Sequence, residues 1–159
     1  VADLYFVYRT LEEEFRVYQH DPILGKLYLP ELERVNNLER DLRYFYGPIW
    51  RGLIKPTEAC NRYCDRITEL ARTTPELLIG HHYTRYLGDL SGGQILKNIA
   101  QKYRSILDEL KLTESQQNAI IVEANYAFRL NMYMFDQLEG NSFASFIKII
   151  IGVIRGRFT

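Results

Sequence analysis

Apolar residues recur along this chain every three or four positions, which is the spacing of amphipathic helices. No stretch shows the strict alternation of apolar and polar residues that predicts a β-strand. The first helix is expected to bury one stripe, formed by Leu4, Tyr8, Leu11, Phe15 and Tyr18. The pattern therefore predicts an all-α fold, and the length of 159 residues suits a single-domain helical bundle over residues 1–159.

Proline and glycine set the limits of the second helix. It is expected to start with Pro30 in its first turn and to end before Gly47-Pro48. Its inward positions would be Leu32, Val35, Leu38, Leu42 and Phe45. A third helix is expected over residues 57–72.

A fourth helix is expected after Thr74-Pro75-Glu76, which combines an N-cap, a first-turn proline and a first-turn acid. Its apolar pattern continues through the glycine-rich residues 88–93. Between Gly93 and Leu110 no turn residue interrupts the helical composition. A helix of this length would be unusual, so it is either kinked or joined where a segment is absent.

The last clear helix starts at Thr113, with Gln116 as its capping-box partner, and is expected to reach Glu139. The apolar run from Phe143 to Ile154 follows. This run is too short to span a bilayer and contains Lys148, so we expect no integral membrane segment. A final helix packed on the core is favoured over one lying on a membrane surface.

Composition excludes some partners. Lysine plus arginine and aspartate plus glutamate both total 20, so the formal net charge is zero and nothing indicates a nucleic-acid partner. We expect no secretory signal, because Val1 leads straight into an amphipathic pattern. Cys60 and Cys64 sit one helical turn apart, where a disulfide would be strained. We expect reduced, partly buried thiols and no metal site between them.

The three histidines offer no clear metal site. His20 falls in a turn, and the adjacent His81 and His82 point about 100° apart on a helix, so they cannot share one ion. Both are interpreted as structural residues. Neither a Glu-x-x-His pair nor His-Glu-x-x-His is present, which argues against di-iron bundles and zinc hydrolases.

Residues 83–94 place three glycines inside a predicted helix. Gly88, Gly92 and Gly93 each cost about 1 kcal/mol relative to alanine, so some gain must offset about 3 kcal/mol. Gly88 and Gly92 lie four positions apart and bare the backbone on one face, against which a flat ligand could lie. A close helix–helix crossing is the alternative interpretation.

Polar residues accompany these glycines. Arg85, Asp89 and Thr84 bring charge and hydrogen-bonding capacity to a segment where a packing seam would be apolar. A buried acid is costly unless it is paired or hydrated. Asn131 interrupts an apolar stripe and is expected to point inward, as is the hydroxyl of Tyr8. The stripe that Asn131 interrupts consists of Ala124, Phe128, Phe135 and Leu138. The combination favours a ligand site containing water. Each residue alone also fits a buried core position at which its hydrogen bonds are made by neighbouring groups.

The segment from Tyr83 to Gln94 closely resembles the distal-helix signature of the haem oxygenases. The resemblance continues through Glu12-Glu13-Glu14, Phe45-Tyr46-Gly47-Pro48, Pro75-Glu76-Leu77-Leu78 and the stretch from Asn131 to Glu139. It covers most of the chain and is similar to the cyanobacterial and plastid members. It implies a bundle of the haem oxygenase type, with a distal helix kinked at its glycines.

In that family haem is both substrate and cofactor. O2 and reducing equivalents open it to biliverdin, carbon monoxide and iron. The resemblance implies reduced ferredoxin as the electron donor and a place in the cyanobacterial cytoplasm or plastid stroma, feeding bilin synthesis. The alternatives are a non-catalytic haem-binding protein of the same fold and a helical interaction module that uses its glycines only for packing.

The resemblance also assigns roles to individual residues. Gly88, Gly92 and Gly93 would let the distal backbone approach the haem face, and Asp89 would hold a water chain that delivers a proton to the bound oxygen. Four residues match positions that tie this network together, namely Arg85, Thr84, Tyr8 and Asn131. Others match positions that hold the haem: Tyr83 and Arg104 near its carboxylates, and Phe128 and Phe135 around the ring.

Two departures from the family pattern stand out. The family's proximal histidine lies on a helix preceding the segment that matches Val1, so the sequence supplies no iron ligand of its own. Gln101 runs directly into Lys102-Tyr103-Arg104, which belong to the next helix in relatives. We therefore expect residues 1–159 to form one haem oxygenase domain that is incomplete at its N-terminus and around residues 101–103.

Overall fold

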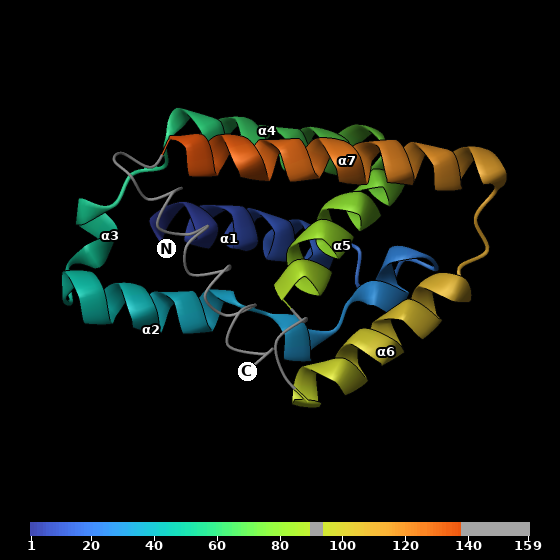
Figure 1. Cartoon of the computed structure of the whole chain (residues 1–159), viewed down its shortest axis with the longest axis horizontal. Coiled ribbons are helices and arrows are strands. Elements are labelled where there is room, and N and C mark those ends of the chain that lie inside the picture. Colours follow the sequence, from blue (N-terminus) through green and yellow to red (C-terminus); the bar gives the residue numbers. More distant parts are fainter. Residues whose placement is uncertain (90–93, 138–159) are drawn as a thin grey trace, which may run out of the picture.

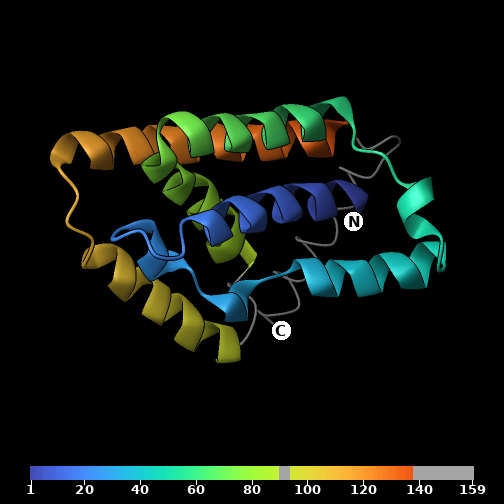
Figure 2. The same cartoon turned by 180° about the vertical axis from the view of Figure 1, so that it is seen from behind.

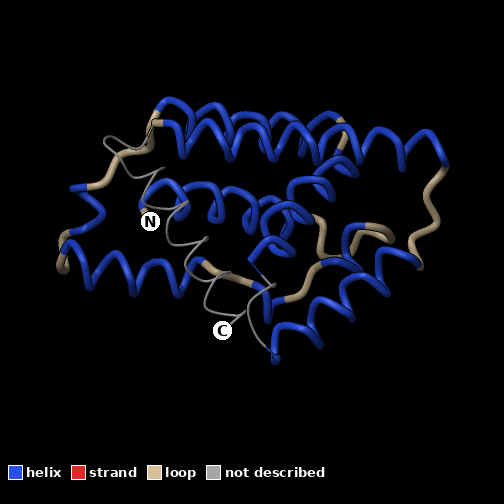
Figure 3. The backbone as a smooth tube through the Cα atoms, in the orientation of Figure 1, coloured by secondary structure: helices blue, strands red, loops and turns tan. Residues whose placement is uncertain are grey.

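The structure is a computed structural model that describes residues 1–89 and 94–137, apart from the side chains of residues 87–89 and 94–97. Every regular element in these ranges is a helix, so the all-α prediction is confirmed (Figure 3). The α-helices are α1 (Ala2–Val17), α2 (Val35–Tyr46), α3 (Trp50–Leu53), α4 (Glu58–Thr73), α5 (Leu78–Asp89), α6 (Gln94–Asp108) and α7 (Glu114–Asp136). Short 3-10 turns are η1 (Leu24–Leu27), η2 (Pro30–Leu32) and η3 (Pro75–Leu77).

Helices α4 and α7 lie side by side and form one layer, with α1 packed beneath α4 (Figure 1). Helix α5 leaves that layer, packs chiefly on α7 and also touches α1. Helix α2 packs on α1, and α6 packs on η1 at the opposite end of the molecule, as the view from behind also shows (Figure 2). Helices α1, α5 and α7, which come from different parts of the sequence, therefore meet at one junction.

The first helix buries the stripe that its sequence predicts. Tyr8, Leu11 and Phe15 are each 2% exposed or less, while Leu4 and Tyr18 pack against the core from its edge. Helix α4 starts at the expected place, because the Thr57 hydroxyl accepts a hydrogen bond from the backbone N–H of Cys60. The capping box predicted at the start of α7 is also present.

The start of α2 differs from the sequence prediction. Pro30 begins only the 3-10 turn η2, and α2 starts at Val35. The cause lies in another helix: the Glu12 carboxylate accepts hydrogen bonds from the backbone N–H groups of Arg34 at 2.6 Å and Val35 at 3.3 Å. An acidic side chain at this point satisfies the free N–H groups of a helix start.

Two other details of the prediction are wrong. Phe45 was expected inward but is 65% exposed, because the buried side chains of α2 are Leu38 and Leu42 in its earlier turns. Thr74 was expected to cap the fourth helix, but its side chain makes no capping bond and η3 precedes α5. The predicted bend in the distal helix stays a prediction, because Gly92 and Gly93 lie outside the described residues.

Helices α5 and α7 cross closely at a glycine that sequence reasoning did not single out. A Cβ atom on Gly80 of α5 would lie 2.8 Å from the backbone nitrogen of Ala124 on α7. Only a residue without a side chain lets the two backbones approach so closely. This crossing sets how α5 lies against α7, and it places the following turns of α5 beside the middle of α7.

Candidate functional site

Arg85 is the centre of a buried polar cluster that joins α1, α5 and α7. Its Nη1 donates to Oδ1 of Asn131 at 2.5 Å, and its Nη2 donates to the Tyr8 hydroxyl at 3.4 Å. The Tyr8 hydroxyl in turn donates to the Arg85 carbonyl at 3.3 Å. The guanidinium carbon also lies 4.9 Å from the centre of the Tyr8 ring. Three of the residues that the sequence predicted for the site are thus brought together.

The cluster is almost closed to solvent. Arg85 is 6% exposed and Tyr8 is 1% exposed, whereas Asn131 is partly buried. A buried guanidinium needs hydrogen-bond acceptors, since an unpaired buried charge costs several kcal/mol. The arrangement therefore holds a fixed positive charge and two hydroxyl or amide groups in one place, which is a setting able to orient ordered water.

Thr84 belongs to the seam beside the cluster. Its hydroxyl donates to the Gly80 carbonyl at 2.8 Å, and the Ala124 carbonyl lies 3.3 Å away as a second acceptor. Thr84 thus ties α5 to α7 through the crossing at Gly80. Its observed contacts are those of a residue that fixes the helix crossing.

Other predicted residues lie on open surfaces. Tyr83 is 45% exposed and Phe128 is 57% exposed, whereas Phe135 is half-buried. Arg104 is exposed on α6, and no contact with the polar cluster is seen among the described side chains. The inward stripe predicted for α7 is therefore wrong at Phe128. The buried face of α7 is made instead by Glu123, Ala127, Leu130 and Met134.

The glycine-rich segment is only partly described. Gly88 and Asp89 form the last two residues of α5, but the side chain of Asp89 lies outside the description. Gly92 and Gly93 also lie outside the described residues. Asp89 follows Arg85 by one helical turn, so the backbone places both residues at the end of α5 that follows the crossing with α7.

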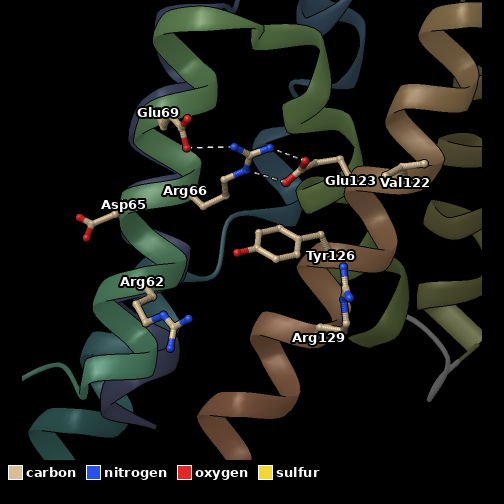
Figure 4. Close-up of a pocket in the computed structure, with 8 residues that line it drawn as sticks. All are labelled: Arg62, Asp65, Arg66, Glu69, Val122, Glu123, Tyr126 and Arg129. Atoms are coloured by element: carbon tan, nitrogen blue, oxygen red, sulfur yellow. Dashed lines mark hydrogen bonds and ion pairs between the residues drawn. The ribbon is translucent and has the colours of Figure 1, made fainter.

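A second buried polar group, which the sequence did not reveal, links α4, α5 and α7. Glu123 is 5% exposed and receives hydrogen bonds from Arg66 at 3.0 and 2.7 Å (Figure 4). Nε2 of the fully buried His81 lies 2.9 Å from the same carboxylate. Burial raises the pKa of Glu123, but the hydrogen bonds from His81 and Arg66 outweigh it and bring the pKa down to about 2. The carboxylate is therefore ionised at neutral pH.

The surface above this ion pair is an open groove of about 680 Å³ between α4 and α7. Figure 4 shows Arg66 between Glu69 and Glu123, with Tyr126 reaching across from α7. The groove is lined by Arg62, Asp65, Arg66, Glu69, Val122, Glu123, Tyr126 and Arg129. Positive and negative groups are equally represented, so the groove has no charge preference that would select a ligand. Phe135 lines a separate pocket of about 250 Å³ near the start of α1.

His82 is enclosed by aromatic rings. Its ring lies parallel to that of Tyr103, 5.4 Å away, and Nδ1 lies 2.8 Å from the Tyr103 hydroxyl. Phe15 and Tyr86 pack at 4.3 and 4.4 Å between ring centres. Burial lowers the pKa of His82 to about 3, so the ring is neutral at physiological pH. Both adjacent histidines are therefore committed to packing and hydrogen bonds, as the sequence suggested.

The described ranges contain neither a metal-binding cluster nor a membrane-spanning helix. Within residues 1–89 and 94–137, no cluster of three or more histidine, cysteine, aspartate or glutamate side chains could hold a metal ion. In those ranges, no helix has the length and apolar character needed to cross a bilayer.

The fold and the cluster define an all-α bundle with a buried polar site at the junction of α1, α5 and α7. The family model described as "Heme oxygenase" matches residues 1–102 and 100–137, which together cover most of the chain. The chain therefore belongs to the haem oxygenase family.

Curated relatives and solved structures agree with this family. "Heme oxygenase 1" of Synechocystis sp. is 43% identical over 167 aligned positions, covering 89% of this chain and 70% of the relative. "Heme oxygenase" of Porphyra purpurea is 38% identical and covers 100% of this chain and 78% of the relative. The crystal structure of Synechocystis heme oxygenase-1 in complex with heme matches with a TM-score of 0.83 at 38% identity, covering 96% of this chain and 81% of that one.

Proposed function

We propose that this chain binds haem beside α5 and α7 and opens the ring to biliverdin, carbon monoxide and iron, using O2 and reducing equivalents. The observation that carries this proposal is the buried cluster of Arg85, Tyr8 and Asn131, in a chain of the haem oxygenase family. The cluster supplies what the reaction needs from the protein, namely a fixed network that orders water and moves protons toward one face of the substrate.

The roles proposed for the distal residues follow from that network. Asp89 holds the water that delivers the proton, and Arg85 orders that water through its contacts with Tyr8 and Asn131. Water held by a carboxylate is a weaker proton donor than an acidic side chain in direct contact with the oxygen. Thr84 keeps α5 at its crossing with α7. Gly88, Gly92 and Gly93 leave room for the substrate to approach the backbone.

The residues proposed to hold the haem are partly open to solvent. The 57% exposed ring of Phe128 and the half-buried ring of Phe135 are apolar surfaces against which a flat, apolar ligand can pack. Arg104 and Tyr83 are exposed and offer donors to the two carboxylates of haem, for which the planar guanidinium is well suited. The two buried histidines, each with a hydrogen-bonding partner, are not proposed as iron ligands.

We also propose reduced ferredoxin as the electron donor and the cyanobacterial cytoplasm or plastid stroma as the compartment. The support is the similarity to relatives from Synechocystis and Porphyra. We further propose that an internal connecting segment of the domain is absent around residues 101–103. In support, the alignment with the Synechocystis relative has 167 positions, more than the 159 residues of the chain, and the two family matches meet at residues 100–102.

The experiment is a haem titration followed by turnover. We expect a sharp Soret band on adding haem, and biliverdin after adding ferredoxin, its reductase and NADPH in air. Asp89→Ala should keep the Soret band and lose biliverdin, whereas Asp136→Ala, at the end of α7, serves as the matched carboxylate control. A missing Soret band would contradict haem binding. A Soret band without biliverdin in the unaltered chain would indicate a non-catalytic haem-binding protein.

A further inference from the structure

The end of α2 and the short helix α3 form a corner at one end of the molecule (Figures 1 and 2). The chain turns between the two helices at Gly47, whose φ of 76° suits a residue without a side chain. Large apolar side chains are exposed on both sides of this turn. Tyr44 is 84% exposed, Ile49 is 70% exposed, and Phe45 and Leu53 are exposed as well. These four residues, called the apolar corner below, play no part in the proposed haem site.

The apolar corner is anchored to the rest of the bundle. Trp50, the residue after Ile49, is 1% exposed, and its ring packs edge-on against that of Tyr5 on α1 with 5.0 Å between ring centres. The guanidinium of Arg51 lies 4.4 Å from the centre of the Trp50 ring and pairs with Glu39 of α2 at 2.7 Å. The exposed side chains are therefore presented on an ordered backbone, which lowers the entropic cost of binding through them.

Positive charge accompanies the apolar corner, although the formal net charge of the whole chain is zero. Residues 39–55 contain four exposed basic side chains, namely Arg40, Arg43, Arg51 and Lys55. The same stretch contains two acids, Glu39 and Asp41, and Glu39 is engaged by Arg51. The corner therefore combines exposed apolar side chains with a local excess of positive charge.

This combination restricts the kind of partner that fits. A contiguous group of exposed apolar side chains marks an interaction surface, and the surrounding positive charge selects a negatively charged partner. A second copy of this chain does not fit, because a symmetric contact at the corner would bring the basic residues of both copies together. Side chains as exposed as Tyr44 and Ile49 project from the surface, and projecting side chains suit a soft layer that they can enter. The interface of an anionic bilayer offers negative headgroups and apolar acyl chains at adjacent depths.

We propose that the apolar corner docks on an anionic lipid surface. Ile49 and Leu53 enter the boundary between headgroups and acyl chains, and the ring of Tyr44 lies at the headgroup level, where tyrosine is enriched. Arg43 and Lys55 face the lipid phosphates. Each basic residue close to an anionic surface strengthens binding about fivefold. Binding through so few side chains is peripheral and reversible, and it weakens at high salt because the charge attraction is screened.

The test mixes the full chain, without haem, with vesicles of phosphatidylcholine alone or of phosphatidylcholine and phosphatidylglycerol, and then sediments the vesicles. We expect the chain to sediment with the anionic vesicles, much less with the neutral ones, and to be released by high salt. Trp50 is the only tryptophan and lies in the corner, so lipids brominated in their acyl chains should quench its fluorescence. Absence of binding, equal binding to both vesicles, or binding without quenching would each overturn the proposal.

Paired variants separate the apolar contribution from the charged one. Ile49→Ser should weaken binding to the anionic vesicles about tenfold, because an apolar side chain no longer leaves water. Ile121→Ser, exposed on α7, is its matched control and should bind like the wild type. Arg43→Gln should weaken binding about fivefold. Its control is Arg72→Gln, because both arginines are exposed in the last turn of their helix.

All four positions are exposed, so the variants should keep the fold, which circular dichroism checks. Equal binding by a variant and its control would contradict the assignment of the corner. Retention of the chain on immobilised polyglutamate, without binding to anionic vesicles, would indicate an acidic protein partner and overturn the proposal. Because no haem is present, this test can fail without affecting the proposed function.

Discussion

Arg85 shows how one buried charge organises a site from three helices. Its guanidinium is 6% exposed, and its contacts with Asn131 and Tyr8 come from residues 46 and 77 positions away in sequence. Hydrogen bonds to charged groups contribute about 1.5–3 kcal/mol each, more than neutral ones. The same contacts that would order water for catalysis therefore also stabilise the junction of α1, α5 and α7.

Replacing Asn131 tests this dual role. Asn131→Ala removes the acceptor of the 2.5 Å hydrogen bond from Nη1 of Arg85, and we expect a loss of about 1–3 kcal/mol in the free energy of unfolding. Urea denaturation monitored by circular dichroism measures it. Asn125→Ala is the matched control, since Asn125 is exposed on the same helix. Equal small losses in both variants would contradict a stabilising role for the cluster.

His82 gives a second residue-scale prediction, in which stability depends on pH. Burial lowers its pKa from 6.5 to about 3 in the folded chain, so between these values the unfolded chain binds more protons. Stability from this residue is therefore complete above about pH 6.5 and is lost as pH falls toward 3. His82→Phe lacks the titration, so the difference in unfolding free energy between wild type and variant should shrink with acidification. A difference that does not change with pH would show that the ring is accessible to protons when folded.

Sequence reasoning found the members of the polar cluster but misplaced the buried face of α7. Asn131 was identified because it interrupts an apolar stripe, Tyr8 because its hydroxyl falls within one, and Arg85 because it brings charge to the glycine-rich segment. The stripe containing Phe128 was chosen for its apolar character, whereas the observed buried face contains Glu123. A buried acid is tolerated only through Arg66 and His81 from other helices, and such distant pairing leaves no periodic signal in the sequence.

At the scale of elements, the approach of α5 to α7 depends on Gly80. Gly80→Ala would place a Cβ 2.8 Å from a backbone nitrogen of α7, so the helices must separate. We expect a loss of about 1–3 kcal/mol, larger than the gain of about 1 kcal/mol in helix propensity. Gly52→Ala in α3 is the control, because nothing lies within 4 Å of its added Cβ. Thermal unfolding of both variants measures the contrast, and equal melting temperatures would refute the close crossing.

Helix starts show when local sequence is sufficient. The start of α7 was predictable because both partners of its capping box, Thr113 and Gln116, lie within one turn. The start of α2 was not, because the carboxylate that satisfies its first N–H groups belongs to Glu12 in another helix. Pro30 is a valid local signal, yet the tertiary contact moves the α-helix onward to Val35. Boundaries set by long-range contacts need the fold before they can be placed.

At the scale of the whole molecule, two buried polar groups join most of the bundle. The Arg85 cluster links α1, α5 and α7, and Glu123 links α4, α5 and α7. Helices α5 and α7 take part in both. On α5, His81 of one group and Arg85 of the other lie about one turn apart and both follow the crossing at Gly80, so a change in either group is expected to be felt at the other.

Glu123 therefore provides the strongest test of the bundle as a unit. Glu123→Gln removes the negative charge that pairs with Arg66 and faces the buried His81, and we expect a loss on the order of 3 kcal/mol at neutral pH. Since the pKa of Glu123 is lowered to about 2, its stabilisation is present above about pH 4.5 and is lost as pH falls toward 2. The difference between wild type and variant in urea titrations should shrink over that range. Glu69→Gln is the matched control, because Glu69 also contacts Arg66, at 2.9 Å. The Glu69 side chain is 60% exposed, and exposed ion pairs contribute about 1 kcal/mol or less to stability. If both variants lose equal stability, burial of the Glu123 carboxylate is not what holds α4, α5 and α7 together.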